Sequence, residues 1–141
     1  MGNSHIDAVS QAHHALMSEI GKLEQAVQNP IELSPPDLLE RLLVIRQAVT
    51  DHFASEEQGG YFEDVLNRAS HLARRLEQLR NDHRRLAAAV DVLIDRARNA
   101  RQVDRELVGQ IKKWIDDLRQ HESQENLLLD DAYNTDLTAE D

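Results

Sequence analysis

The feature that most constrains this chain is a set of four apolar seams with helical spacing. Leu38, Leu42, Ile45 and Val49 recur every three or four residues, which is the spacing of a helix face turned toward a core. Comparable seams lie on both sides of this segment along the chain. Because such faces are buried by packing helices side by side with short connections, the sequence predicts an all-α fold, an antiparallel up-down-up-down four-helix bundle.

Turn and cap residues predict where the four helices begin and end. Asn29–Pro30 should end the first helix, because the residue before a proline avoids the α region. Ser34 and Asp104 are suited to cap the second and fourth helices, and Gly59–Gly60 should end the second. The predicted helices are about 7–28, 36–58, 61 or 70 to 98, and 104–132, followed by a loose polar tail over 133–141. At 141 residues, the chain is predicted to form a single domain over 1–141.

Composition supports helices and argues against several classes of function. Aromatic residues make up only 4% of the chain, and Gly and Pro are few, which is typical of a helical bundle. The absence of cysteine excludes disulfides, thiolate zinc sites and iron–sulfur clusters. A net charge of −10 argues against a nucleic-acid partner. The sequence has neither an apolar run of membrane-spanning length nor the features of a signal peptide, so we expect no membrane association and a cytoplasmic location.

Each apolar seam is interrupted by a histidine, and two of the histidines are followed one turn later by a glutamate. These six residues are His13, His52, Glu56, His83, His121 and Glu125. One buried histidine often only donates a hydrogen bond to a backbone carbonyl. In an antiparallel bundle, however, all four histidines would lie about 24 Å from the same end, at about 1.5 Å rise per residue. The sequence therefore predicts one polar layer across the core.

A polar layer of this composition is suited to binding metal ions. Four imidazoles and two carboxylates buried without partners would cost several kcal/mol per charged group, and bound cations remove that cost. Six ligands are many for one ion and about right for two; if both glutamates bridge the ions, positions remain for a bridging oxygen and an exogenous molecule. Imidazole and carboxylate ligands favour iron, while manganese or zinc could also bind. The Glu-x-x-His pairs of ferritin-like bundles are absent from the seams, which disfavours that class.

Other polar residues near the six have alternative interpretations. His14 is one residue off the first seam and is the main alternative to its neighbour as a ligand. His71 would lie about 18 Å along an unbroken third helix from the histidine of that seam, so it could join the site only if the helix kinks. Glu57 and Glu122 could accept hydrogen bonds from ligand rings, or they could be solvated helix charges. Trp114 is expected in the core.

The stretches HFASEE at 52–57, LRNDHRRL at 79–86 and HESQENLLL at 121–129, together with His13 and the apolar residues after it, resemble the hemerythrin-like, HHE cation-binding family. The resemblance covers about residues 6–133 and implies an antiparallel four-helix bundle around a non-haem di-iron centre with the same six ligands. Oxygen-carrying members have a histidine where this chain has Leu79 and an aspartate where it has Asn126. The set here is closer to members linked to iron-centre repair, nitric oxide or iron responses, and it departs from the pattern of reversible oxygen carriers.

Three functions fit these observations. The leading hypothesis is a di-iron protein that binds or reacts with oxygen, nitric oxide or peroxide; without an imidazole at position 79, one iron should be more open to such ligands. The second is an iron-sensing or iron-handling module, in which metal occupancy stabilises the fold. The third is a non-catalytic helical interaction domain, whose protein partner the sequence does not identify. No substrate-specific catalytic motif is present, so the sequence leaves open whether the protein is an enzyme.

Overall fold

Helices account for nearly all of the chain in the computed structural model, which describes residues 4–58 and 60–140, and the side chains of 8–58 and 60–132. Within these residues there are five α-helices, two short 3-10 helices and no β-strand. The elements are α1 (Ser4–Gln28), η1 (Pro30–Glu32), α2 (Pro35–Gln58), α3 (Tyr61–Arg68), η2 (Ser70–Leu72), α4 (Ala73–Asn99) and α5 (Arg105–Glu140). The prediction of an all-α fold is confirmed, with five α-helices in place of four.

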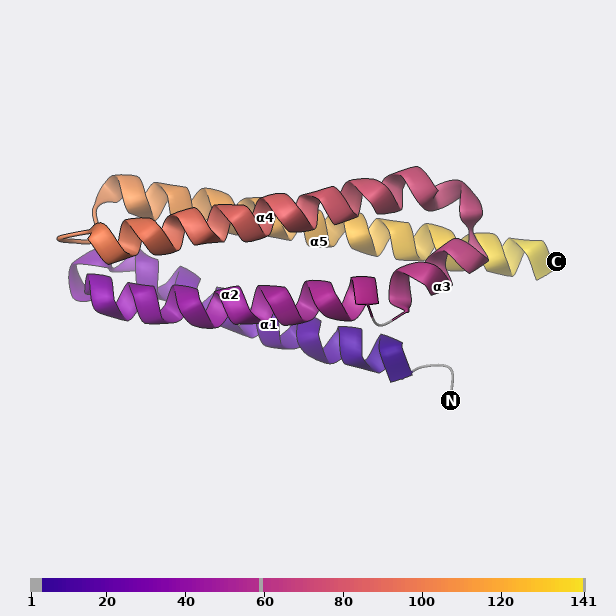
Figure 1. Cartoon of the computed structure of the whole chain (residues 1–141), viewed down its shortest axis with the longest axis horizontal. Helices are drawn as coiled ribbons and strands as arrows, with labels where there is room; N and C mark the ends of the chain where they lie inside the picture. Colours follow the sequence, from indigo (N-terminus) through magenta and orange to yellow (C-terminus); the bar gives the residue numbers. More distant parts are fainter. Residues whose placement is uncertain (1–3, 59, 141) are drawn as a thin grey trace.

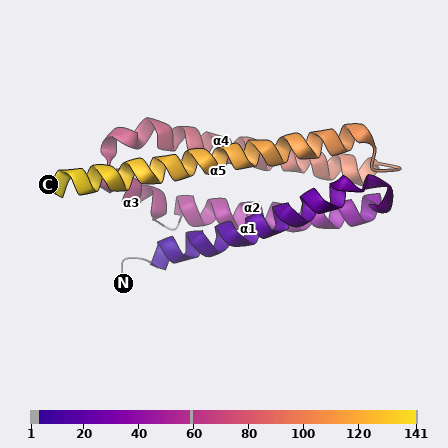
Figure 2. The ribbon, with the colours of Figure 1, turned by 180° about the vertical axis from the view of Figure 1, so that it is seen from behind.

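The four long helices lie lengthwise beside one another, and each runs opposite to the long helix before it (Figure 1). Helix α1 packs on α2, α2 on α4, and α4 on α5. The view from behind shows α5 in front of α4 and α1 in front of α2 (Figure 2). The short helix α3 lies at the end where α1 begins and α5 ends. None of the helices in the described part of the chain is long and apolar enough to cross a membrane.

Capping explains where two of the long helices begin. The Ser34 hydroxyl accepts a hydrogen bond from the backbone N–H of Asp37 at 3.2 Å in the first turn of α2. The Asp104 carboxylate does the same for the backbone N–H of Leu107 at 2.9 Å in α5. Helix α1 ends at Gln28, directly before Asn29–Pro30. These boundaries agree closely with those expected from the sequence.

One boundary that the sequence left open, a third helix starting at 61 or at 70, is seen in the structure, and one other boundary differs from the sequence prediction. The third predicted helix is divided: α3 ends at Arg68, Ala69 has a non-helical φ of −150°, and α4 begins at Ala73 after η2. Gly60 enters α3 with a φ of +89°, a left-handed conformation that glycine adopts without strain. Helix α5 continues to Glu140, past the expected end at 132. No proline or glycine interrupts residues 133–140.

A layer of buried polar side chains divides the core into two apolar clusters. The large core runs from the layer toward the η1 end and includes Leu16, Leu42, Val90 and Leu118. The small core lies on the α3 side and includes Val9, Phe62, Val65, Leu76, Leu79 and Leu128. The buried polar residues between them are His52, Glu56, His83, His121, Glu122 and Glu125. The predicted polar layer is therefore present, with Glu122 as an additional member.

Candidate metal centre

The six residues expected to bind metal all lie in the polar layer or at its edge. His52, Glu56, His83, His121 and Glu125 are buried, and His13 is half-buried. With Glu122 they form two groups, each with one possible ligand atom per residue lying within 4.8 Å of the others. The first group is Glu56, His83, His121 and Glu125, and the second is His13, His52 and Glu122. Whether these residues bind metal is untested and stays a prediction.

The first group joins side chains from α2, α4 and α5. His83 Nε2 lies 3.3 Å from Glu56 Oε1, and His121 Nε2 lies 3.5 Å from Glu125 Oε2. The His–Glu pair on α5 is one helical turn apart, so both side chains lie on the same face. Two imidazole nitrogens and two carboxylates thus face one small volume between the two apolar cores.

The second group lies where α1, α2 and α5 meet. The Glu122 carboxylate contacts two rings at once: His13 Nδ1 lies 3.1 Å from Oε2, and His52 Nε2 lies 3.1 Å from Oε1. Since Glu122 is only 5% exposed, the interpretation of it as a solvated helix charge is wrong. His52 Nε2 also lies 3.6 Å from Glu56 Oε1, so this ring lies between the two groups.

Two acidic residues outside the groups hold the imidazole rings of the first group in place. His83 Nδ1 lies 2.9 Å from Glu57 Oε2, and His121 Nδ1 lies 3.3 Å from Asp82 Oδ2. A carboxylate that accepts a hydrogen bond from one ring nitrogen keeps the proton on that nitrogen. The other ring nitrogen then has a lone pair that can bind a cation. Glu57 therefore acts as a ring acceptor, one of its two expected roles. Asp82 was not expected from the sequence.

Burial and neighbouring charge shift the pKa values of the polar layer in opposite directions. Burial raises the pKa of Glu56 well above its usual value, and the neighbouring Glu125 raises it further. Burial also raises the pKa of Glu122, but the hydrogen bonds from His13 and His52 and their charge outweigh it and lower that pKa to about 2. The pKa of His13 is raised, chiefly by its hydrogen bond to Glu122. In the metal-free protein, Glu122 is therefore the ionised partner of these two rings.

In the first group, the pKa values of the two histidine rings shift in opposite directions. Burial lowers the pKa of His83 below its usual value, and the hydrogen bond to Glu57 only partly compensates. Burial also lowers the pKa of His121, but contact with Glu125 and Asp82 outweighs it, and the net shift is upward. A neutral imidazole presents a lone pair to a cation, so His83 is already in the form that binds metal.

Several buried atoms of the layer have no hydrogen-bond partner. They are His52 Nδ1, both carboxylate oxygens of Glu56, His83 Nε2, His121 Nε2 and Glu125 Oε2. Leaving a polar atom buried and unsatisfied costs free energy, so such atoms need an explanation when they gather in one place. Cations bound between the rings and carboxylates would satisfy all of these atoms except His52 Nδ1, which is the nitrogen of that ring away from Glu56 and Glu122, and the donor set is one that iron, manganese and zinc accept. The residues present therefore fit a metal centre.

Comparison with known protein families found a match. The sequence pattern of the hemerythrin HHE cation-binding domain matches residues 4–131. The chain belongs to this family. Its hemerythrin HHE domain implies that it binds a metal cation. No curated protein and no solved structure matched the chain.

At two positions this hemerythrin-like chain differs from the oxygen-carrying pattern. Leu79 is buried in the small core, where it supplies apolar packing and no ligand atom. Asn126 is exposed on α5, so its side chain lies outside the polar layer. Neither alternative histidine is buried: His14 is exposed, and His71 is exposed in η2. The groups among the described residues contain His13 and not His14.

From the sequence, Glu122 is expected only as an acceptor from ligand rings or as a solvated charge, and not on the core face, because α5 has two apolar seams with helical spacing. The seam chosen from the sequence runs through Leu118, His121 and Glu125. A second seam passes through Ile111, Ile115, Leu118, Glu122 and Glu125, all of them buried. That spacing of four, three, four and three was visible in the sequence and would have placed Glu122 on the core face.

Aromatic rings pack against the first group. Phe53 of α2 stacks on His83 with ring centroids 3.8 Å apart and planes 7° apart. Phe62 of α3 packs against the same histidine, with ring centroids 5.8 Å apart. Both phenylalanines are buried, so helix α3 contributes directly to the apolar wall beside the His83 ring. Trp114, expected in the core, is buried and donates a hydrogen bond to the Leu86 carbonyl.

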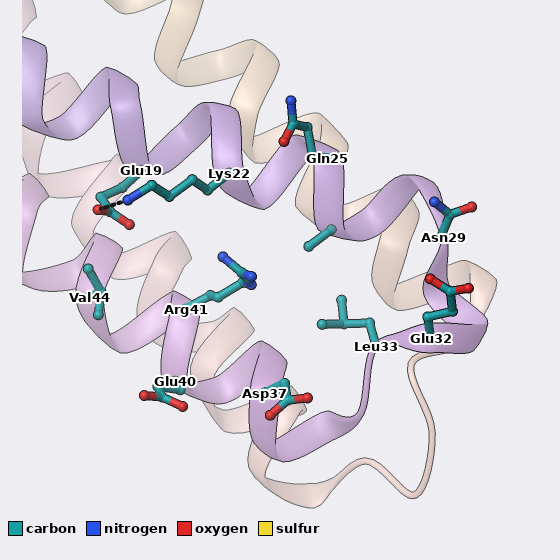
Figure 3. A pocket seen from close by; sticks show the side chains of 11 residues that line it. Glu19, Lys22, Gln25, Asn29, Glu32, Leu33, Asp37, Glu40, Arg41 and Val44 are labelled. Atoms are coloured by element: carbon teal, nitrogen blue, oxygen red, sulfur yellow. Dashed lines mark hydrogen bonds and ion pairs between the residues drawn. The ribbon is translucent and has the colours of Figure 1, made fainter.

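Two grooves reach residues of the first group, and a third lies apart. One groove of about 620 Å³ between α2 and α4 is lined by Phe53, Glu57 and His83. Another of about 490 Å³ between α4 and α5 is lined by Asp82 and His121. The groove in Figure 3 lies between α1 and α2 near their connection, with Arg41 reaching into it. No member of the two His–Glu groups lines that third groove.

Proposed function

We propose that the protein binds two iron ions and uses them to bind or react with oxygen, nitric oxide or peroxide. The proposed ligands are His13, His52, Glu56, His83, His121 and Glu125, with a bridging oxygen. In this proposal α1, α2, α4 and α5 form the antiparallel four-helix bundle of hemerythrin-like proteins, and α3 is an added segment. The observation that carries the proposal is the gathering of buried, unpartnered ring nitrogens and carboxylate oxygens between the two apolar cores.

The protein's own residues would prepare the site for such chemistry. Glu57 and Asp82 accept from Nδ1 of their rings, so each Nε2 is directed toward Glu56 or Glu125. Phe53 keeps water from one face of the His83 ring. Bound iron would supply an open coordination position and the electrons for a reaction with a small oxidant.

The surroundings of the first group support a small exogenous ligand. Leu79 supplies no imidazole, so the ion between His83 and His121 would have fewer protein ligands than in an oxygen carrier. The two grooves lined by His121 and by His83 border this buried donor set. A diatomic molecule or peroxide is small enough to approach the donor set from such a groove.

Elemental analysis of the protein, purified without chelator or nickel resin, tests the proposal. We expect about two irons per chain, lost in His52→Ala and Glu56→Ala and retained in His71→Ala, because His71 is exposed and outside both groups. A wild-type protein that takes up no iron would refute the proposal. An iron absorption band that changes with oxygen, peroxide or nitric oxide supports the reactive function. Iron binding that raises stability without any such response would instead support the sensing or handling function.

A further inference from the structure

We infer that Glu122 is a seventh protein ligand, a carboxylate bound to the ion held by His13 and His52. This inference rests on the proposed function, because it assumes that a metal binds between these rings. It goes beyond that function by giving the second group a carboxylate of its own. The two ions would then have different protein surroundings, with Glu122 on one side and Leu79 in place of a ligand on the other.

The position of the Glu122 carboxylate sets it apart from the ring acceptors Glu57 and Asp82. The side chain of Glu122 is 7% exposed and lies between two rings from different helices, with one oxygen 3.1 Å from each. By comparison, the side chains of Glu57 and Asp82 are 32% and 23% exposed, and each contacts a single ring. Glu122 therefore lies inside the polar layer, whereas the two ring acceptors lie at its rim.

On the His52 ring, Glu122 contacts the nitrogen opposite to the one that the ring acceptors contact on their rings. Glu57 and Asp82 contact Nδ1, on the opposite side of the ring from the nitrogen that faces Glu56 or Glu125. Glu122 contacts His52 at Nε2, the same nitrogen that faces Glu56 at 3.6 Å. The Glu122 oxygen thus lies on the side of the ring where an ion shared with Glu56 would bind.

Metal binding removes the proton from the coordinating ring nitrogen. A nitrogen that coordinates an ion has no N–H to donate, so Glu122 would lose its hydrogen bond from His52. It would lose the hydrogen bond from His13 as well if the ion binds Nδ1, the nitrogen of that ring that faces Glu122, and the carboxylate would then be buried and unpaired. Such a group is costly unless the ion itself binds it. The spacing suits this outcome, because two atoms about 2.1 Å from one ion and at right angles are about 3 Å apart.

The test compares Glu122→Gln with Glu57→Gln, loading metal-free protein with Fe(II) without oxygen and then dialysing it against a competing chelator. A glutamine still accepts a hydrogen bond but is a much weaker ligand for iron. If Glu122 is a ligand, E122Q keeps about one iron per chain after dialysis. E57Q keeps both, because the change of a ring acceptor weakens metal binding by only about 10–100-fold and removes no ligand. Mössbauer spectra should show two iron environments in the wild type and the loss of one in E122Q.

If E122Q keeps both irons as tightly as E57Q does, the inference is overturned while the proposed function stands. A wild type that takes up no iron overturns both. Should E122Q fail to fold, as judged by circular dichroism of the metal-free form, a crystal structure of the metal-loaded wild type decides. A Glu122 oxygen about 2.1 Å from an ion supports the inference, and one more than about 3 Å away refutes it.

Discussion

The Glu56 carboxylate is the group whose replacement should most sharply separate stability from metal binding. It is fully buried, and neither oxygen has a hydrogen-bond partner. Methionine has a similar length, needs no partner and adapts to its surroundings. A buried polar group left unsatisfied costs about 1–3 kcal/mol. We therefore expect the metal-free Glu56→Met variant to be more stable than the metal-free wild type by about that amount.

With iron bound, the wild type should be more stable than Glu56→Met. An ion present at about 1,000 times its dissociation constant stabilises the folded state by about 4 kcal/mol, and only the wild type retains the Glu56 ligand. Urea denaturation with and without iron measures both differences. In thermal denaturation, 1 kcal/mol corresponds to roughly 3–5 °C for a chain of this length. The variant should thus melt above the wild type without iron and below it with iron.

The matched control is Glu40→Met, a replacement at an exposed position on the same helix. It should change the free energy of unfolding by no more than about 0.5 kcal/mol and preserve the response to iron. A metal-free Glu56→Met protein that is less stable than the wild type would refute the reasoning, because it would mean that the carboxylate is already satisfied without metal.

Other residues give three further tests. Because the pKa of Glu56 is raised, mainly by burial, the stability that its protonated form contributes is complete below about pH 4.5 and is lost as the pH rises through its folded pKa. The advantage of metal-free Glu56→Met in urea should therefore widen toward alkaline pH, and a constant difference would contradict this. His13→Ala should lower the iron content by about one ion per chain, whereas His14→Ala, at an exposed position, should leave it unchanged. Equal losses of iron in the two variants would show that the choice of His13 over His14 as the ligand is wrong. Gly60→Ala should destabilise the protein by about 1–2 kcal/mol, because Gly60 has a φ of +89°. Gly109→Ala, at an exposed position in α5 with open space around it, should stabilise the protein by about 0.5–1 kcal/mol. If both variants change the free energy of unfolding in the same direction, the left-handed conformation of Gly60 is refuted.

The helical class and the polar layer could be predicted because both follow from one periodic signal. A seam that replaces leucine with His52 and Glu56 places those side chains where leucine would be buried. The depth of each histidine could be counted from the helix ends, since rise per residue is nearly constant. The side-chain partners could not be counted in this way. Asp82 contacts His121 across the interface between α4 and α5. The rotation of one packed helix relative to the other decides such a contact, and the sequence of a single helix does not determine it.

The sequence left the start of the third long helix open between residues 61 and 70 for a different reason. The sequence from Arg68 to Ala73 contains no proline or glycine, so no local residue type requires the helix to end. Tyr61, Phe62 and Val65 are all buried in the small core. The gain from burying these side chains exceeds the local preference for a continuous helix, and tertiary packing sets the boundary.

The division of the core by the polar layer has a consequence for cooperativity. Apolar contacts alone would let the large core and the small core open as separate units, since the buried residues between them are charged or polar. Ions bound by α1, α2, α4 and α5 would join the two units into one. Amide hydrogens of α3 and of the start of α4 should then exchange faster in the metal-free protein, while those around Leu42 and Val90 change little. The end of the molecule where α1 begins and α5 ends (Figure 1) would thus report, through its rigidity, whether the centre is filled.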